Sequence, residues 1–254
     1  MKRRTRLVDR SAGSPVSTAA GRWPHNAGTL SRHDLEQNRM REIYAAAMDP
    51  SYAMSDVELS ESLTATLGAK PKGAGWWVFA YGSLLWNPLF PVAEMRAGTL
   101  VGLHRRFCLW SLASRGTREC PGLVLGLDRG GACRGVAMRL PSPLALDELH
   151  LLWRREMVAN SYRPTWVRVA ADGRELVALT FVVRRNHPQY AGKLPLDRQV
   201  DVLGRACGAF GSSLDYLERT RVALVSHGIV DPYLEGLAAR LAARSPVAAD
   251  EVDL

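Results

Sequence analysis

The sequence predicts an α+β fold built on a mixed or closed β-sheet, with helices packed against it. Short β-like runs separated by Gly and Pro fill residues 76 to 140, and the chain after residue 190 is helix-compatible. Strands come first and helices late, without the strict alternation of βαβ units, and this order is typical of α+β proteins. At 254 residues and 47% hydrophobic content, the chain has enough apolar side chains for a core.

Composition divides the chain into three expected parts: residues 1–29, 30–75 and 76–245. The first part mixes Arg, Ser, Gly and Pro with little apolar periodicity, so we expect a disordered basic tail. In the second part, Ser31–Met48 has a helical apolar pattern. Ser55 and Glu58 have the spacing of a capping box, which predicts that a second helix begins there. Residues 70–75, rich in Gly, Lys and Pro, form the expected linker into the third part.

The third part opens with an apolar run, residues 76–80, that predicts a buried strand leading into Tyr81-Gly82-Ser83-Leu84. A long helix is expected from about Leu144 to Asn160. The other expected strands are 98–103, 105–111, 122–128, 134–140, 165–170 and 175–184, with hairpin turns at 128–131 and 171–173. The other expected helices are 196–207, 212–227 and 232–243.

The net charge of +8 does not by itself indicate a nucleic-acid partner. Residues 1–10 hold five basic side chains and one acidic side chain, so they account for half of the net positive charge. The remaining basic residues follow no known reading motif, so we expect no specific nucleic-acid partner. No apolar run approaches the roughly 18 residues of a membrane span, and the N-terminus lacks the apolar centre of a secretory signal. We therefore expect a cytoplasmic protein without a membrane partner.

The cysteines and histidines do not predict a metal site. Cys108, Cys120, Cys133 and Cys207 show no Cys-x-x-Cys spacing and no paired histidines at ligand distances. We interpret them as reduced, mostly buried thiols. The histidines are scattered singly along the chain.

Glu156 is the most informative acidic residue. Leu149, Leu152, Trp153 and Glu156 stand at i, i+3, i+4 and i+7, so the carboxylate shares a helix face with side chains that should face the core. Burial would raise its pKa, as a group that takes and returns a proton near neutral pH requires. Most helical glutamates are instead solvated, and the neighbouring Arg154 or Arg155 can hold this one in a surface ion pair.

The loop after the first strand has two readings. Gly82 permits φ > 0, so the N–H groups of Gly82, Ser83 and Leu84 can form a small anion-binding concavity. On composition alone, an ordinary turn after a core strand is the favoured interpretation over a ligand-binding loop. Ser83 as a nucleophile is a weak hypothesis, because the second Gly of the Gly-x-Ser-x-Gly elbow is absent.

An ordered set of motifs resembles the ChaC-type γ-glutamylcyclotransferases. The first is Phe79-Ala80-Tyr81-Gly82-Ser83-Leu84-Leu85-Trp86-Asn87-Pro88. The others are Arg115-Gly116-Thr117, residues 121–127, Arg134-Gly135-Val136-Ala137, Trp153-Arg154-Arg155-Glu156-Met157, residues 162–167 and Gly211-Ser212-Ser213-Leu214-Asp215-Tyr216-Leu217. No single motif is specific, but the ordered set is, and the resemblance covers about residues 55 to 240.

The resemblance implies a small closed sheet with packed helices and a cofactor-free lyase acting on glutathione. In that family the α-amino group of the γ-glutamyl residue attacks its own γ-carbonyl, which yields 5-oxoproline and cysteinylglycine. Glu156 matches the catalytic glutamate, and Tyr81, Gly82, Ser83 and Leu84 match the glutamyl-binding loop. Tyr162 and Tyr190 match aromatic positions that contact substrate.

Two other functions remain open from the sequence. The same chemistry can act on other γ-glutamyl amino acids or amines, and a non-catalytic module can bind a γ-glutamyl metabolite. A retained Glu156 argues against the binding module, since a carboxylate-binding pocket has no use for a buried acid beside its ligand. The sequence does not define an oligomeric state or the role of the basic tail.

Overall fold

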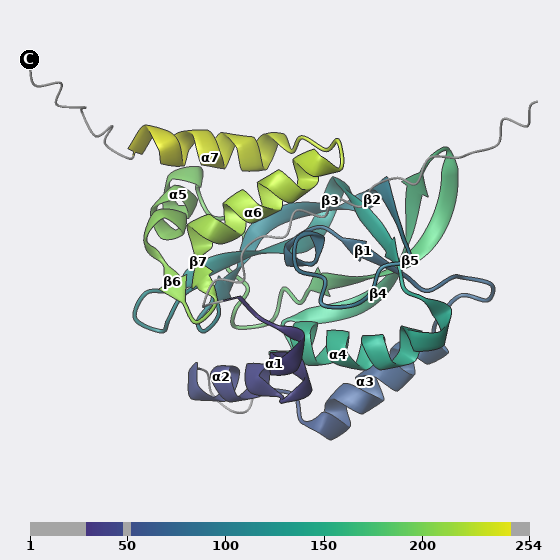
Figure 1. The fold of residues 1–254 in the computed structure, drawn as a ribbon. Helices are drawn as coiled ribbons and strands as arrows, with labels where there is room; N and C mark the ends of the chain where they lie inside the picture. The colour runs from purple at the N-terminus through teal and green to yellow at the C-terminus, as the bar shows by residue number, and fades with distance from the viewer. Residues whose placement is uncertain (1–28, 48–51, 245–254) are drawn as a thin grey trace, which may run out of the picture.

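The computed structural model describes residues 29–47 and 52–244 of the chain (Figure 1). The expected disorder of residues 1–29 falls outside this part, apart from residue 29, and the division into three parts stays a prediction. The helices are α1 (Arg32–Glu36), α2 (Arg39–Ala47), α3 (Asp56–Gly68), η2 (Ser83–Leu85), η3 (Ser142–Leu144), α4 (Ala145–Glu156), α5 (Leu196–Arg205), α6 (Ser213–Ser226) and α7 (Pro232–Arg244). The strands are β1 (Trp77–Ala80), β2 (Glu94–Ser111), β3 (Gly122–Arg139), β4 (Tyr162–Ala171), β5 (Arg174–Val183), β6 (Cys207–Gly208) and β7 (Gly211–Ser212).

The five long strands form a closed mixed barrel in the order β1-β3-β2-β4-β5. Neighbours are antiparallel, β4 and β5 included, except that β5 runs parallel to β1 at the pair Val78↔Leu179 and to β3 at Leu127↔Val182. Phe79, Leu125 and Phe181 are at most 1% exposed and lie in one continuous apolar core. The predicted fold class, an α+β protein with a small closed mixed sheet, is confirmed.

Helices cover two sides of the barrel (Figure 1). α3 and α4 lie together on one side, with α1 and α2 beside α4, while α5, α6 and α7 form a layer on the other side. β1 leaves the barrel between these two layers and continues into η2, which contacts α6. The loop after β1 is therefore held between a sheet and a helix rather than exposed as a free turn.

Two predicted local features are confirmed. Ser55 caps α3, and its side chain and that of Glu58 each bond the other's backbone N–H, as in a capping box. The hairpin between β4 and β5 turns at Asp172 and Gly173, whose φ values are 50° and 70°. Two positive φ angles match the twist of the flanking strands, and this is why Asp-Gly predicts such a turn.

Three predicted boundaries are wrong. The turn at 128–131 is a bulge within the single strand β3, because Gly130 and Gly131 take φ of 95° and 66° opposite a register shift between Val101 and Leu103. The helix expected over Ser31–Met48 is interrupted at Asn38, whose φ is 56°, giving α1 and α2. The helix expected to reach Asn160 ends at Glu156.

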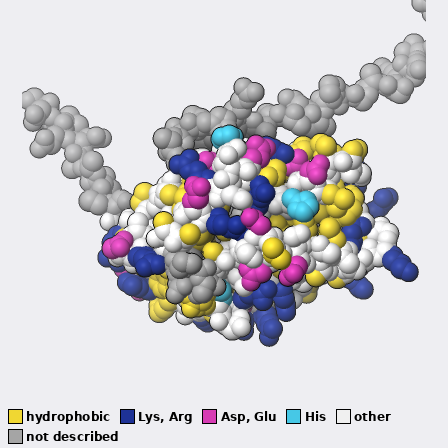
Figure 2. All heavy atoms as spheres, turned by 90° about the horizontal axis from the view of Figure 1, so that it is seen from below, with side chains coloured by type: hydrophobic (Ala, Val, Ile, Leu, Met, Phe, Trp, Pro, Cys, Tyr) yellow, Lys and Arg dark blue, Asp and Glu magenta, His cyan; other side chains and the backbone are white. Residues whose placement is uncertain are grey.

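Charged side chains of both signs are mixed over the face shown in Figure 2, which is the molecule of Figure 1 seen from below. Ion pairs join charged side chains within α1 and between α1 and α2: Arg32 bonds Glu36 at 3.0 Å and Arg39 bonds Asp34 at 2.9 Å. On this face the excess positive charge is therefore not gathered into one basic patch.

Candidate active site

The loop after β1 is held in place at its first residue, Tyr81, by one hydrogen bond from the side chain and one to the backbone carbonyl. The Tyr81 hydroxyl donates a hydrogen bond to the Phe181 carbonyl at 2.8 Å, and Arg105 Nε donates to the Tyr81 carbonyl at 2.6 Å. Ser83 and Leu84 then begin the 3₁₀ helix η2, so their N–H groups have no acceptor within that helix. The loop thus presents backbone donors on a rigid support, as an anion-binding concavity requires.

Gly82 is needed for space rather than for a positive φ. Its φ is −139°, so the expectation that it takes a left-handed conformation is wrong. A Cβ added at this position would lie 2.8 Å from the Tyr216 hydroxyl oxygen. The phenol of Tyr216, from α6, therefore lies directly over the backbone of the loop, and only glycine leaves room for it.

Glu156 is the last residue of α4, and its side chain is 13% exposed. Leu149, Leu152 and Trp153 on the same face are at most 2% exposed, so the helix does direct this carboxylate toward the interior. Burial raises the pKa of Glu156, and the guanidinium of Arg155 beside it opposes that rise. A carboxylate with a raised pKa and a close positive charge is suited to taking up and releasing a proton.

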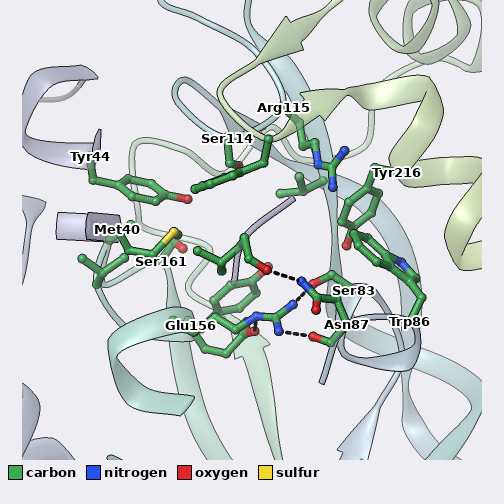
Figure 3. A pocket seen from close by; sticks show the side chains of 17 residues that line it. Met40, Tyr44, Ser83, Trp86, Asn87, Ser114, Arg115, Glu156, Ser161 and Tyr216 are labelled. Atoms are coloured by element: carbon green, nitrogen blue, oxygen red, sulfur yellow. Dashed lines mark hydrogen bonds and ion pairs between the residues drawn. The ribbon is translucent and has the colours of Figure 1, made fainter. Parts of the chain in front are cut away.

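Arg155 connects the glutamate to the loop (Figure 3). Its Nε lies 2.9 Å from Glu156 Oε1, its Nη2 donates to Ser83 Oγ at 2.9 Å, and its Nη1 donates to the Asn87 carbonyl. The Arg155 side chain is 6% exposed. The ion pair suggested by the sequence therefore exists, but it lies inside the protein rather than on the surface.

A cavity of about 110 Å³ opens beside these groups, with a smaller recess below it. The two spaces share four lining residues: Ser83, Glu156, Tyr162 and Tyr216. The recess is otherwise lined by Tyr81, Gly82, Leu84, Leu125 and Phe181. Glu156 consequently stands where the recess meets the cavity, within reach of a ligand that occupies both.

Six of the seven residues predicted from the sequence lie around the recess: Tyr81, Gly82, Ser83, Leu84, Glu156 and Tyr162. The Tyr162 hydroxyl donates to the Leu125 carbonyl at 3.0 Å. Tyr190 is not brought to either space, because its hydroxyl donates to Asp128 Oδ2 at 2.7 Å and its ring packs near Cys108. None of the described residues that line the two spaces is a histidine, so Ser83 has no neighbouring base for nucleophilic attack.

Arg115 is the main group that sequence reasoning did not assign to the site. It lines the cavity, pairs with Asp215 at 3.0 Å and lies over the rings of Trp86 and Tyr216, 5.4 and 5.5 Å from their centroids. Burial lowers the pKa of Arg115, while Asp215 opposes that change. The sequence did indicate Arg115 as part of the Arg115-Gly116-Thr117 motif of the family resemblance, but it assigned that motif no function.

The remaining chemistry-bearing residues lie apart from the cavity. Cys108 and Cys133 are buried, whereas Cys120 and Cys207 are exposed, so the expectation of mostly buried thiols holds for half of them. Among residues 29–47 and 52–244, no three His, Cys, Asp or Glu side chains form a possible metal-binding group. Within the same described part, no helix has the length and apolar character needed to cross a membrane.

Fold and site together define a class: an α+β barrel protein whose buried carboxylate faces a backbone loop at the end of the first strand. The sequence profile described as "ChaC-like protein" matches residues 76–244, about two thirds of the chain. This protein belongs to the ChaC-like family.

Two relatives and one solved structure document the similarity. The Escherichia coli (strain K12) protein named glutathione-specific gamma-glutamylcyclotransferase is 39% identical over 192 residues, covering 75% of this chain and 83% of the relative. The mouse glutathione-specific gamma-glutamylcyclotransferase 1 is 34% identical over 149 residues, covering 56% of this chain and 66% of the mouse protein. A crystal structure of the yeast gamma-glutamyl cyclotransferase specific to glutathione matches with a TM-score of 0.62, at 21% identity, over 67% of this chain and 97% of that one. The yeast structure supports the fold.

Proposed function

We propose that this protein is a glutathione-specific γ-glutamylcyclotransferase that converts glutathione into 5-oxoproline and cysteinylglycine. The family, and the names of its Escherichia coli and mouse relatives, support this function. The observation that carries it is the position of Glu156, a buried carboxylate at the junction of the loop recess and the cavity. A substrate whose reacting carbonyl lies at that junction meets the proton carrier there.

The reaction is intramolecular, so holding the glutamyl chain folded supplies much of the acceleration. In this proposal the N–H groups of Ser83 and Leu84 bind the α-carboxylate in the recess. Glu156 takes a proton from the α-ammonium group, and the resulting amine attacks the γ-carbonyl carbon. The new C–N bond closes the ring, and the bond to the cysteinyl nitrogen breaks as Glu156 returns its proton to that nitrogen. The ring nitrogen then gives up its second proton through Glu156 to the free amine of cysteinylglycine, which leaves a neutral lactam.

The charges around the cavity favour an anionic substrate. Glutathione is net negative near pH 7, and two buried guanidinium groups, Arg115 and Arg155, line the cavity. Arg155 is already occupied by Glu156, Ser83 and Asn87, which makes it a positioning residue. Arg115 has one carboxylate partner, Asp215, and is available to attract the carboxylate at the glycine end.

The test is release of 5-oxoproline from glutathione by the purified protein and by Glu156→Gln. We expect the variant to lose at least about a hundredfold in kcat, the usual scale of a proton-transfer group. Glu175→Gln is the matched control, since the Glu175 side chain is 62% exposed near the start of β5 and lines neither space, so this variant should keep full activity. Full activity of Glu156→Gln would remove Glu156 as the proton carrier.

Substrate range is tested by comparing glutathione with γ-glutamylalanine. Faster turnover of γ-glutamylalanine would favour the broader γ-glutamyl activity, and glutathione binding without product would favour a binding module.

We also infer a cytoplasmic location, which the four free cysteines support because such thiols persist in reducing compartments. The mixed charge of the face in Figure 2 supports the inference that nucleic acid is not a specific partner.

A further inference from the structure

The cavity takes part of its wall from outside residues 76–244, the region matched by the family profile. Leu30, Met40 and Tyr44, which precede that region, line the cavity together with Glu156. In Figure 3, Met40 and Tyr44 approach from the side opposite Trp86 and Tyr216. The segment that carries them, residues 29–47, is called the N-terminal wall below.

The N-terminal wall is packed against the part of the chain that follows the catalytic helix. Leu30, Leu35 and Met40 form an apolar cluster with Val158, Ala159 and Phe210. Leu35 is 1% exposed and Met40 is 6% exposed, so the contact is dry. Such burial is typical of a fixed part of a fold rather than of a segment resting loosely on its surface.

Polar contacts anchor the N-terminal wall to both halves of the active site. Arg32 bonds the carboxylate of Glu148, on the catalytic helix α4, at 2.7 and 3.1 Å. The Asn87 side-chain amide, at the end of the loop that holds Ser83, donates to the Leu30 carbonyl at 2.9 Å. Arg154 donates to the Glu36 carbonyl at 3.2 Å. The wall is thereby placed relative to both the proton carrier and the loop.

Of the three side chains with which the N-terminal wall lines the cavity, Tyr44 is the polar one. Its ring points into the cavity toward Ser114 (Figure 3). Burial raises the pKa of Tyr44, a hydrogen bond with the Ser114 side chain opposes this rise, and the charge of Glu156 adds to it. The phenol therefore keeps its proton at neutral pH and is available as a hydrogen-bond donor to a ligand.

The division of the substrate between the two spaces follows from the position of Glu156. The recess is lined only by residues between 81 and 216, and the backbone donors of Ser83 and Leu84 beside it suit the α-carboxylate of the glutamyl part. Because the reacting carbonyl must lie at Glu156, the rest of the substrate extends into the cavity, where Leu30, Met40 and Tyr44 lie. The cysteine side chain of glutathione can pack against the apolar, polarizable side chain of Met40. The Cys–Gly peptide carbonyl can accept a hydrogen bond from the Tyr44 phenol.

We infer that the N-terminal wall receives the departing dipeptide and that Tyr44 is a specificity-determining residue, whose hydroxyl donates to the Cys–Gly peptide carbonyl. This inference rests on the proposed function. A γ-glutamyl alkylamide, which has no carbonyl or carboxylate at that position, gains nothing from Tyr44. The wall therefore selects glutathione over γ-glutamyl amines.

The test compares Tyr44→Phe with the wild type on two substrates. For glutathione we expect kcat/KM to fall about tenfold, the effect of one buried hydrogen bond, and for γ-glutamylethylamide, which has no acceptor at that position, to stay within about twofold. Inhibition of glutathione turnover by added cysteinylglycine should weaken by a similar factor. Tyr52→Phe is the matched control, because Tyr52 is 38% exposed and lines a different surface hollow.

Each outcome has a distinct meaning. An equal fall for both substrates would assign Tyr44 a merely structural role, and unchanged values for glutathione and for cysteinylglycine inhibition would overturn the inference while the proposed function stands. A wild-type protein that releases 5-oxoproline from neither substrate would overturn the proposed function and this inference with it. Thermal unfolding of each variant shows whether the fold is kept.

Discussion

Replacing Arg155 by Met should both destabilise the protein and shift its pH–rate profile. The change removes the guanidinium that lies 2.9 Å from Glu156 Oε1 and leaves a carboxylate that is 13% exposed without its partner. Breaking a buried ion pair from one side costs about 3–5 kcal/mol. For a domain of this size, that corresponds to a fall in Tm of roughly 6–20 °C.

The sign of the pH effect follows from the same contact. Arg155 lowers the pKa of Glu156 against the larger rise caused by burial. Without Arg155 the pKa of Glu156 rises further, so the carboxylate that must accept the substrate proton is lost at a higher pH. We expect the acid limb of kcat/KM against pH to move upward, toward neutral pH.

The assay is 5-oxoproline release from glutathione over a range of pH, with thermal unfolding measured in parallel. Arg168→Met is the matched control, because Arg168 is 78% exposed and pairs with Glu175 at 3.6 Å on the surface. Such a pair contributes about 0–1 kcal/mol, so this control should unfold close to the wild-type Tm and keep its pH profile. An acid limb that stays in place in Arg155→Met would refute the assignment of Arg155 as the counterion of the proton carrier.

Two further changes test the loop. Gly82→Ala places a Cβ 2.8 Å from the Tyr216 hydroxyl oxygen and should lower kcat/KM about tenfold or more; Tyr216→Phe in the same chain removes that oxygen and should restore part of the loss, measured as a double-mutant cycle. Ser83→Ala removes only the Nη2–Oγ bond to Arg155 and should cost about tenfold in kcat/KM. A loss near the millionfold scale of a missing nucleophile would revive covalent catalysis by Ser83.

The sequence was most informative where a local pattern has one physical meaning. The capping box at Ser55 and the Asp-Gly turn at Asp172 each satisfy backbone geometry with nearby residues, and both are confirmed. The turn expected at 128–131 shows the limit of such signals. A pair of glycines permits positive φ in a turn and in a bulge alike, and only the pairing of β3 with β2 decides between them.

Site residues could be predicted from the sequence when their position within a single helix or loop indicates their role. Residues that reach the cavity only because separate elements pack together could not be predicted in this way. Glu156 could be assigned to the buried face of α4 by counting from Leu149, and the loop by its position after β1. Tyr216 and Arg115 reach the cavity from separate segments, so no spacing in the chain relates them to Glu156. Their contribution depends on how α6 and the loop after β2 pack against η2.

Arg154 and Arg155 show why this limit matters for the chemistry. On an ideal helix, each residue turns by about 100°, so Arg154 lies nearly opposite the core-facing stripe that includes Glu156, and Arg155 lies at its edge. Periodicity alone does not decide whether an edge residue is solvated. Arg155 is buried because the loop from Ser83 to Asn87 lies over it and accepts a hydrogen bond from each of its two Nη atoms. The same packing that buries Arg155 gives Glu156 a fixed counterion, and so the acid limb of the pH profile is set by the loop as much as by the helix.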